Sequence, residues 1–82
     1  MNPAKTLLLA INQRFIDDVG PIGDLLIDDA KRAWREQNWR GPVAFRHYIK
    51  NLASNIENNH CQQRFLDDAG QLLLHAQNRA AS

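Results

Sequence analysis

Three pairs of adjacent aspartates are the side chains in this sequence whose type and spacing could bind a divalent cation. They are Asp17-Asp18, Asp28-Asp29 and Asp67-Asp68. On a helix, Asp24 and Asp28 share a face, so their carboxylates could hold a cation such as Mg²⁺ between them. A metal-dependent enzyme built on aspartate-rich helices needs a larger cavity than 82 residues can enclose. We therefore expect the aspartates to form a solvated acidic face.

Histidine and cysteine are too sparse to predict a metal site or a nucleophile. The sequence has three histidines and one cysteine, and only His60 and Cys61 are adjacent. A structural zinc site needs about four clustered ligands, and Cys61 has no recognisable base beside it. No glycine-rich phosphate loop and no Ser/His/Asp arrangement is present in the sequence. We therefore predict a protein that is not an enzyme, with no catalytic residue, no cofactor and no metal ligand.

The central segment 31–50 combines basic and aromatic residues. It contains six basic residues and one acidic residue, a net charge of +5, whereas the rest of the chain carries −4. Its four aromatic residues are Trp34, Trp39, Phe45 and Tyr48. They could complete the core, form the centre of a protein interface, or stack on the bases of a nucleic acid while arginines contact phosphates.

Trp39 is the aromatic residue of this segment that does not fit an apolar helical stripe. It lies just before Gly41-Pro42, in a predicted connection between helices. We therefore take Trp39 as a candidate contact for a partner. The other candidates are the neighbouring arginines Arg35, Arg40 and Arg46.

Length and composition predict one cytoplasmic domain, residues 1–82. Hydrophobic residues make up 44% of the chain and charged residues 23%, and the net charge of +1 indicates neither a nucleic acid nor a membrane as partner. The longest apolar run near the N-terminus, Leu7 to Ile11, is too short for a signal peptide, and no segment is long enough to span a membrane. A lone cysteine, which cannot form an internal disulfide, fits a reducing compartment.

Apolar spacing and two Gly-Pro pairs predict an all-α fold. Apolar residues recur at spacings of three and four in four stretches, and Gly20-Pro21 and Gly41-Pro42 separate the first three of these stretches. Asn58-Asn59 marks a break or a cap before the fourth stretch. We therefore expect a compact bundle of four helices at about 3–19, 21–38, 42–57 and 60–79.

An eight-residue segment occurs twice in the chain. Residues 13–20 read Gln-Arg-Phe-Ile-Asp-Asp-Val-Gly and residues 63–70 read Gln-Arg-Phe-Leu-Asp-Asp-Ala-Gly, so six of the eight positions are identical. A repeated unit usually has a repeated structural role, and the simplest role here is helix packing. We predict that both copies are scaffold, with Phe15 and Phe65 buried in a shared core.

The aspartates of the repeat are in an unusual position. Asp17 and Asp18 are expected in the last turn of the first helix, where the helix dipole disfavours negative charge. Arg14, three and four residues earlier, offsets part of this cost. Since both copies contain the same trio, two interpretations are open: a surface ion pair, and a site for a partner.

Several short motifs resemble a known family. Val19-Gly20-Pro21-Ile22-Gly23, Leu26-Ile27 with Ala30, Leu52-Ala53 with Ile56, and Arg64-Phe65-Leu66 resemble a small helical domain found at the C-terminal end of bacterial serine/threonine kinases and other signalling proteins. The family signature has alanine where this chain has Gly23. The resemblance covers roughly residues 11 to 66. It implies an accessory or interaction module in signalling, without known catalysis.

These observations favour a non-enzymatic protein-interaction or signalling accessory module. The basic, aromatic segment beside an acidic remainder could pair one copy of the chain with another, so a homodimer is among the expected states. The alternative is a nucleic-acid-binding helical domain that uses segment 31–50. The sequence does not identify the partner.

Overall fold

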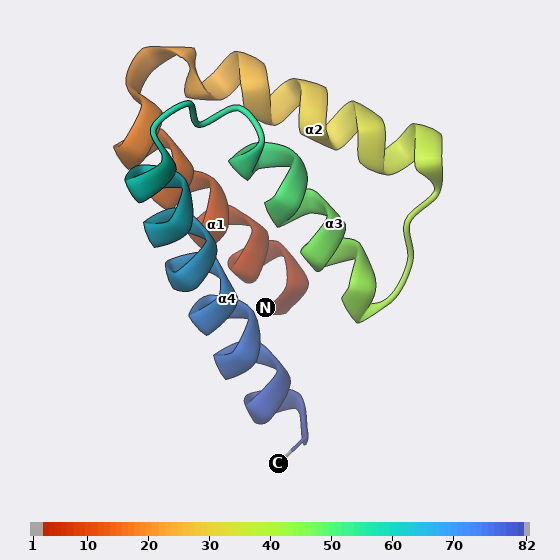
Figure 1. The fold of residues 1–82 in the computed structure, drawn as a ribbon. Coiled ribbons are helices and arrows are strands. Elements are labelled where there is room, and N and C mark those ends of the chain that lie inside the picture. The colour runs from red at the N-terminus through yellow and green to blue at the C-terminus, as the bar shows by residue number, and fades with distance from the viewer. Residues whose placement is uncertain (1–2, 82) are drawn as a thin grey trace.

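The computed structural model describes residues 3–81 (side chains of residues 4–77), and all regular secondary structure in that range is helical. The elements are α1 (Pro3–Val19), the short 3-10 helix η1 (Gly20–Ile22), α2 (Gly23–Gln37), α3 (Pro42–Ala53) and α4 (Asn59–Ala81) (Figure 1). The predicted all-α class is therefore confirmed. None of these helices combines the length and the apolar character needed to cross a membrane.

The Gly20-Pro21 pair redirects the chain without interrupting the helical run. Gly20 has a φ of 77°, which only glycine adopts at low cost. Pro21 lies in the first turn of η1, where its missing N–H is not needed. No non-helical residue separates α1, η1 and α2, so the described chain forms three uninterrupted helical runs, residues 3–37, 42–53 and 59–81. The sequence predicted four separate helices, and the bundle of four helices is not confirmed in that detail.

The helix α3 ends at Ala53, so its predicted end at residue 57 is wrong. The Oγ of Ser54 and the Nδ2 of Asn55 both donate to the carbonyl oxygen of Asn51. Such side-chain bonds to nearby backbone compete with helix continuation. Ile56, which the stripe placed on the helix, lies in the following connection and is still buried.

Asparagines cap two of the helix ends. Asn38 follows α2 in the left-handed conformation, with a φ of 55°, which asparagine tolerates better than most residues. At the start of α4 the Oδ1 of Asn58 accepts a hydrogen bond of 3.0 Å from the backbone N–H of Cys61. The predicted cap at Asn58-Asn59 is therefore confirmed.

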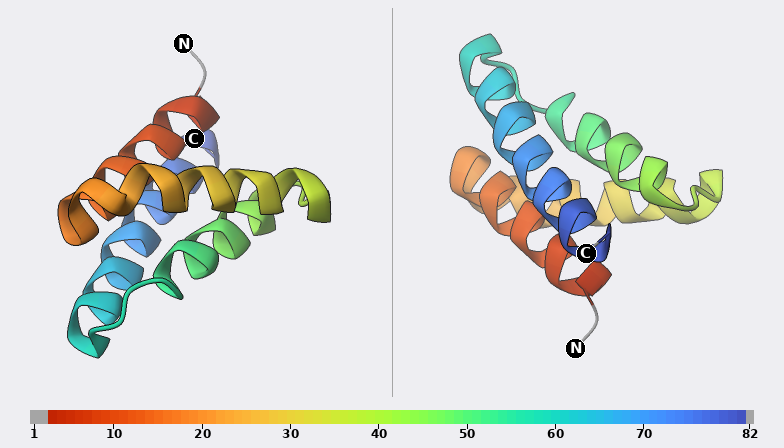
Figure 2. Two further views of the ribbon diagram at one scale, coloured as in Figure 1. Left: turned by 90° about the horizontal axis from the view of Figure 1, so that it is seen from above. Right: turned by 90° about the horizontal axis from the view of Figure 1, so that it is seen from below.

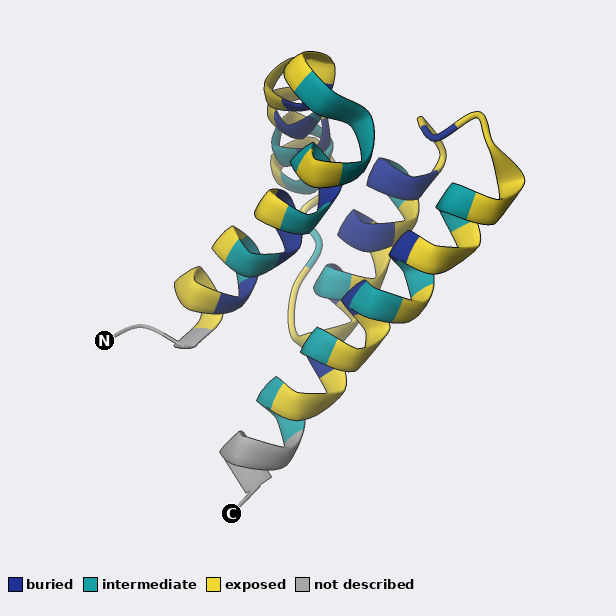
Figure 3. Ribbon diagram, turned by 90° about the vertical axis from the view of Figure 1, so that its left-hand side faces the viewer, coloured by how far each residue is buried: buried dark blue, intermediate teal, exposed yellow. Residues whose placement is uncertain are grey.

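The core lies between the helices, which turn their buried positions toward one another (Figure 3). The helices α1 and α4 run side by side in opposite directions (Figures 1 and 2). Between them, Phe15 and Phe65 are fully buried and meet edge to face, with ring centroids 5.5 Å apart. Such aromatic pairs contribute about 0.5–1.5 kcal/mol beyond their burial. The predicted burial of both phenylalanines is confirmed.

The close approach of α1 and α2 leaves little room for a side chain at Gly23. A Cβ at Gly23 would lie 2.9 Å from Cγ1 of Ile16 and 3.3 Å from its Cα. Ile16 would therefore have to shift to admit even the methyl group of an alanine. Glycine is needed at this position because the helices pack closely, and not because the backbone has a positive φ.

Candidate functional site

The aromatic residues of segment 31–50 gather where α2 meets α3. The Trp34 ring lies 5.2 Å from the Phe45 ring, 5.4 Å from the Tyr48 ring and 6.4 Å from the Trp39 ring. Trp34 also donates its indole N–H to the carbonyl oxygen of Trp39, over 3.1 Å. Tyr48 is fully buried, and Trp34 and Phe45 pack against the core. The aromatics thus hold α2, α3 and their connection together.

Trp39, a candidate partner contact, is already engaged in contacts within the chain. It is partly buried, and its ring also stacks on the imidazole of His47, with centroids 5.1 Å apart and planes 24° from parallel. Among the candidate arginines, Arg35 lies exposed in the last turn of α2 and Arg40 lies exposed in the connection. Arg46 is exposed on α3. The aromatic cluster therefore includes Trp39, while the arginines spread along two helices and the connection between them.

An open groove between α3 and α4 contains one of the predicted residues, Arg46. Its volume is about 380 Å³. Its main lining residues are Arg46, Ile49, Lys50, Leu66, Leu73 and Leu74. Arg46 and Lys50 lie one turn apart on α3 and are both exposed, so the groove has an apolar floor and a basic edge.

Gly70 keeps the α4 side of this groove open. It is helical, it lines the groove, and a Cβ built on it would meet no atom within 4 Å. Leu74, one turn further along α4, is 49% exposed although it is a large apolar residue. Sequence reasoning missed this groove. Two sequence signals could have revealed it. Gly70 lies inside a helical pattern and no proline follows it, and Leu74 is an extra apolar residue beside the apolar stripe of the same helix.

A second groove lies between α1 and α2 and has an acidic edge. Its volume is about 370 Å³; Leu9, Ile16 and Ile27 line it together with Asp24, Asp28 and the basic Lys31. The two aspartates therefore share a face, as their spacing predicts. Among the residues that the structure describes, no three His, Cys, Asp or Glu side chains lie close enough together to hold a metal ion.

Tyr48 and Asn12 form a buried polar contact between α3 and α1. The Tyr48 hydroxyl donates to Oδ1 of Asn12 over 2.5 Å, and Asn12 is 7% exposed. Burial raises the pKa of Tyr48 to about 12, and the negative charge of Asp28 acts in the same direction. Tyr48 is thus a neutral hydrogen-bond donor at physiological pH, which is a structural role.

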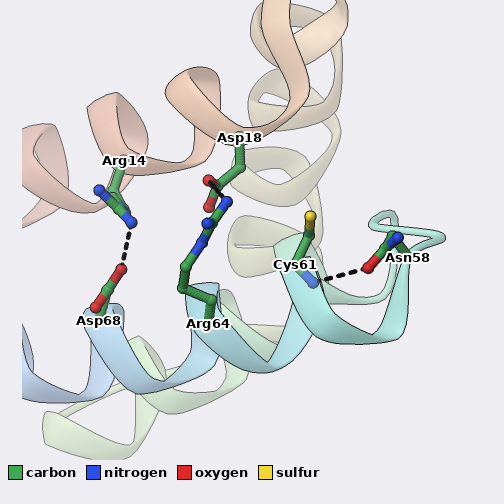
Figure 4. A network of polar contacts seen from close by, with 6 residues as sticks. All are labelled: Arg14, Asp18, Asn58, Cys61, Arg64 and Asp68. Carbon is green, nitrogen blue, oxygen red and sulfur yellow. Dashed lines mark hydrogen bonds and ion pairs between the residues drawn. The ribbon is translucent and has the colours of Figure 1, made fainter.

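The repeated Arg and Asp residues pair across α1 and α4 (Figure 4). Nη2 of Arg14 lies 2.5 Å from Oδ2 of Asp68, and Nη2 of Arg64 lies 3.4 Å from Oδ1 of Asp18. Each copy therefore offers its arginine to the aspartate of the other copy. Of the two interpretations left open by the sequence, the structure shows an ion pair, and it joins two helices instead of lying along one.

Fold and grooves together define a small all-helical domain whose conspicuous surface features are two shallow grooves, one with a basic edge and one lined by two aspartates and a lysine. The chain belongs to DUF8082, a family described as a domain of unknown function, whose model matches residues 6–79. No curated protein and no solved structure gives a significant match to the chain.

Proposed function

We propose that this protein is a non-enzymatic interaction module that binds an amphipathic helix with an acidic flank in the groove between α3 and α4. The observation that supports this most is the combination in one groove of an apolar floor and a basic edge. Amphipathic helices bind proteins by laying their apolar face into such grooves. The charge of Arg46 and Lys50 selects a helix with aspartate or glutamate beside its apolar face.

The helical glycine in the groove supports the same function. A glycine inside a helix costs about 1 kcal/mol relative to alanine. At Gly70 nothing in the fold needs that glycine, because its surroundings leave space for a Cβ. The missing side chain allows the backbone of a bound helix to approach α4 closely. We therefore place the axis of the bound helix over Gly70 and Leu74.

The remaining predicted residues extend this surface in the proposal. Arg35 and Arg40 are exposed on α2 and in the connection to α3, so they add positive charge around the aromatic cluster. Trp39 supports the connection through Trp34 and His47. A cytoplasmic role as a signalling accessory domain agrees with the resemblance noted in the sequence and belongs to the same proposal.

Selection from a library of displayed helical peptides tests this function. We expect enrichment of peptides with apolar residues at i, i+3 or i+4, and i+7, flanked by aspartate or glutamate. Leu74→Glu and Arg46→Glu should each weaken binding of the selected peptides at least tenfold. Val43→Glu is the matched control, because Val43 is 51% exposed on α3 but does not line the groove. Selected peptides that bind Leu74→Glu as well as the wild type would contradict the proposal.

Nucleic-acid binding by segment 31–50 stays an alternative. The exposed side chains of Arg35, Arg40, Arg46 and Lys50 favour it, whereas the aromatic rings of the segment are occupied with one another. It requires an affinity that falls steeply with salt, since phosphate contacts release counterions. A gel shift with no bound band at low salt would eliminate this alternative.

A further inference from the structure

The start of α2 carries the chemistry that the groove between α3 and α4 requires. Ile22 and Leu25 lie three residues apart on a helical run and are 54% and 68% exposed. The aspartates of this stretch are all exposed; they are Asp24, Asp28 and Asp29. Residues 22–29, which we name the acidic ridge, therefore present two apolar anchors and three aspartates. Asp29 pairs with Arg32 over 3.7 Å, and Lys31 lines the groove between α1 and α2 beside Asp24 and Asp28. An amphipathic helix with an acidic flank has this composition.

The acidic ridge cannot enter the groove of its own chain. The helices α2 and α4 lie on opposite sides of the molecule, with α1 and α3 between them (Figure 2). Contact between the ridge and the groove is therefore possible only between two copies. The two surfaces are also complementary in charge, because the groove carries Arg46 and Lys50 at its edge.

We infer that the chain assembles head to tail, with the acidic ridge of one copy bound in the groove between α3 and α4 of the next. This inference rests on the proposed function and names the partner as a second copy. Leu25 and Ile22 are the apolar anchors, and Asp24 and Asp28 face the basic edge formed by Arg46 and Lys50.

The contact joins two different surfaces, so each dimer retains one free ridge and one free groove. Such heterologous contacts continue into rings or open chains of subunits. The assembly therefore grows with concentration beyond the dimer. Because opposite charges meet at its edge, it also weakens with added salt.

Sedimentation or light scattering over a concentration series at low salt tests the inference. We expect the average mass of the wild type to rise from the 9.4 kDa of one chain through and beyond that of a dimer. Leu25→Glu replaces an apolar anchor of the ridge with a charge, and Leu74→Glu places a charge in the groove. Each substitution should weaken association at least tenfold. Val43→Glu should assemble like the wild type, and circular dichroism checks that all variants fold.

Mixing the two defective variants gives the sharpest result. Leu25→Glu keeps an intact groove and Leu74→Glu keeps an intact ridge, so one contact can form between them and no second. We expect the mixture to produce heterodimers and nothing larger. A wild type that stays monomeric at every concentration, or a mixture that stays monomeric, would overturn the inference.

The peptide-binding experiment distinguishes failure of the head-to-tail inference from failure of the proposed function. Leu25 is not in the groove, so Leu25→Glu should bind the selected peptides like the wild type. Peptide binding without self-association would overturn the head-to-tail inference and leave the groove as a site for another protein. Loss of both in the wild type would overturn the two proposals together.

Discussion

The two copies of the repeated segment contain nearly the same residues and make the same contacts with each other. Residues 13–20 lie on α1 and η1, and residues 63–70 lie on α4. In each copy the glutamine donates to the first aspartate of the pair, over 3.0 Å in the first copy and 2.9 Å in the second. The phenylalanines meet at the centre and the arginines pair with the aspartates of the opposite copy. The repeat thus encodes a self-complementary helix pair.

The same residues behave differently where their neighbours differ. Gly20 has a φ of 77° and is followed by Pro21, whereas Gly70 is helical and is followed by Gln71. The side chain of Asp18 is 4% exposed, whereas that of Asp68 is 41% exposed. Position in the fold, and not residue type, therefore decides which copy carries buried charge and which copy faces the open groove.

The largest expected effect is shared by the two copies. Phe15→Ala and Phe65→Ala should each destabilise the fold by about 3–5 kcal/mol, because both rings are fully buried. Urea unfolding followed by circular dichroism measures both, and a protein this small is expected to lose most of its stability. A cost below about 1 kcal/mol for one of them would break the symmetry claimed for the pair.

The arginines should show unequal effects. Arg64→Met leaves the buried carboxylate of Asp18 without its ion-pair partner and should cost about 1–3 kcal/mol, since an unsatisfied buried group loses its solvation. Arg14→Met leaves Asp68 in contact with water and should cost about 0–1 kcal/mol. Equal losses in the unfolding free energy of the two variants would contradict the difference in burial.

The glycines should show effects of opposite sign. Gly20→Ala places a side chain at a positive φ and should destabilise the fold by about 1–2 kcal/mol. Gly70→Ala should stabilise the fold by about 0.4–1 kcal/mol, because the site is helical and open. Thermal unfolding of both variants gives the comparison. If both changes lower the melting temperature, the claim that Gly70 lies in an open helical site while Gly20 requires a positive φ is contradicted.

The residues just before each copy both bond to α3, but only the contact of the first copy contains a group that titrates at alkaline pH. Asn12 accepts a hydrogen bond from Tyr48, and Gln62 donates one to the carbonyl oxygen of Ala53, so both connect their helix to α3. The pKa of Tyr48 is raised from 10.0 to about 12 in the folded protein. The protonated hydroxyl therefore contributes fully to the free energy of unfolding below pH 10, and this contribution is lost as the pH rises toward 12.

The chain has one tyrosine, so ultraviolet absorbance of the tyrosinate reports Tyr48 directly. We expect its titration midpoint to lie well above that of free tyrosine while the protein stays folded. Tyr48→Phe should remove the loss of stability between pH 10 and 12, and Gln62→Ala should keep it. A normal tyrosine titration in the folded protein would contradict the buried contact.

The sequence predicted the elements that depend on local spacing. The apolar stripes placed Phe15 and Phe65 in the core, and Asn58 identified the start of α4. The end of α3 was missed because Ser54 and Asn55 bond to the backbone of Asn51, which an apolar stripe does not reveal. The unbroken run through Gly20 was missed because a glycine and a proline are also compatible with a 3-10 turn.

The candidate site was predicted less well than the fold. Composition found the basic segment and Arg46, but it did not reveal that Trp39 stacks on His47. The groove depends on how α3 and α4 lie against each other, and no local pattern fixes that arrangement. The reciprocal ion pairs likewise required the antiparallel alignment of α1 and α4, although the repeated Arg and Asp residues were visible from the start.

The most direct test of the pairing between the two copies is a nuclear Overhauser measurement on the wild-type protein with labelled phenylalanine. Ring protons of Phe15 and Phe65 should show strong cross-peaks, because their ring centroids lie 5.5 Å apart with planes at 66°. Absence of these cross-peaks in a folded sample would show that the repeated segments do not pack on each other, and would contradict the fold from which both grooves follow.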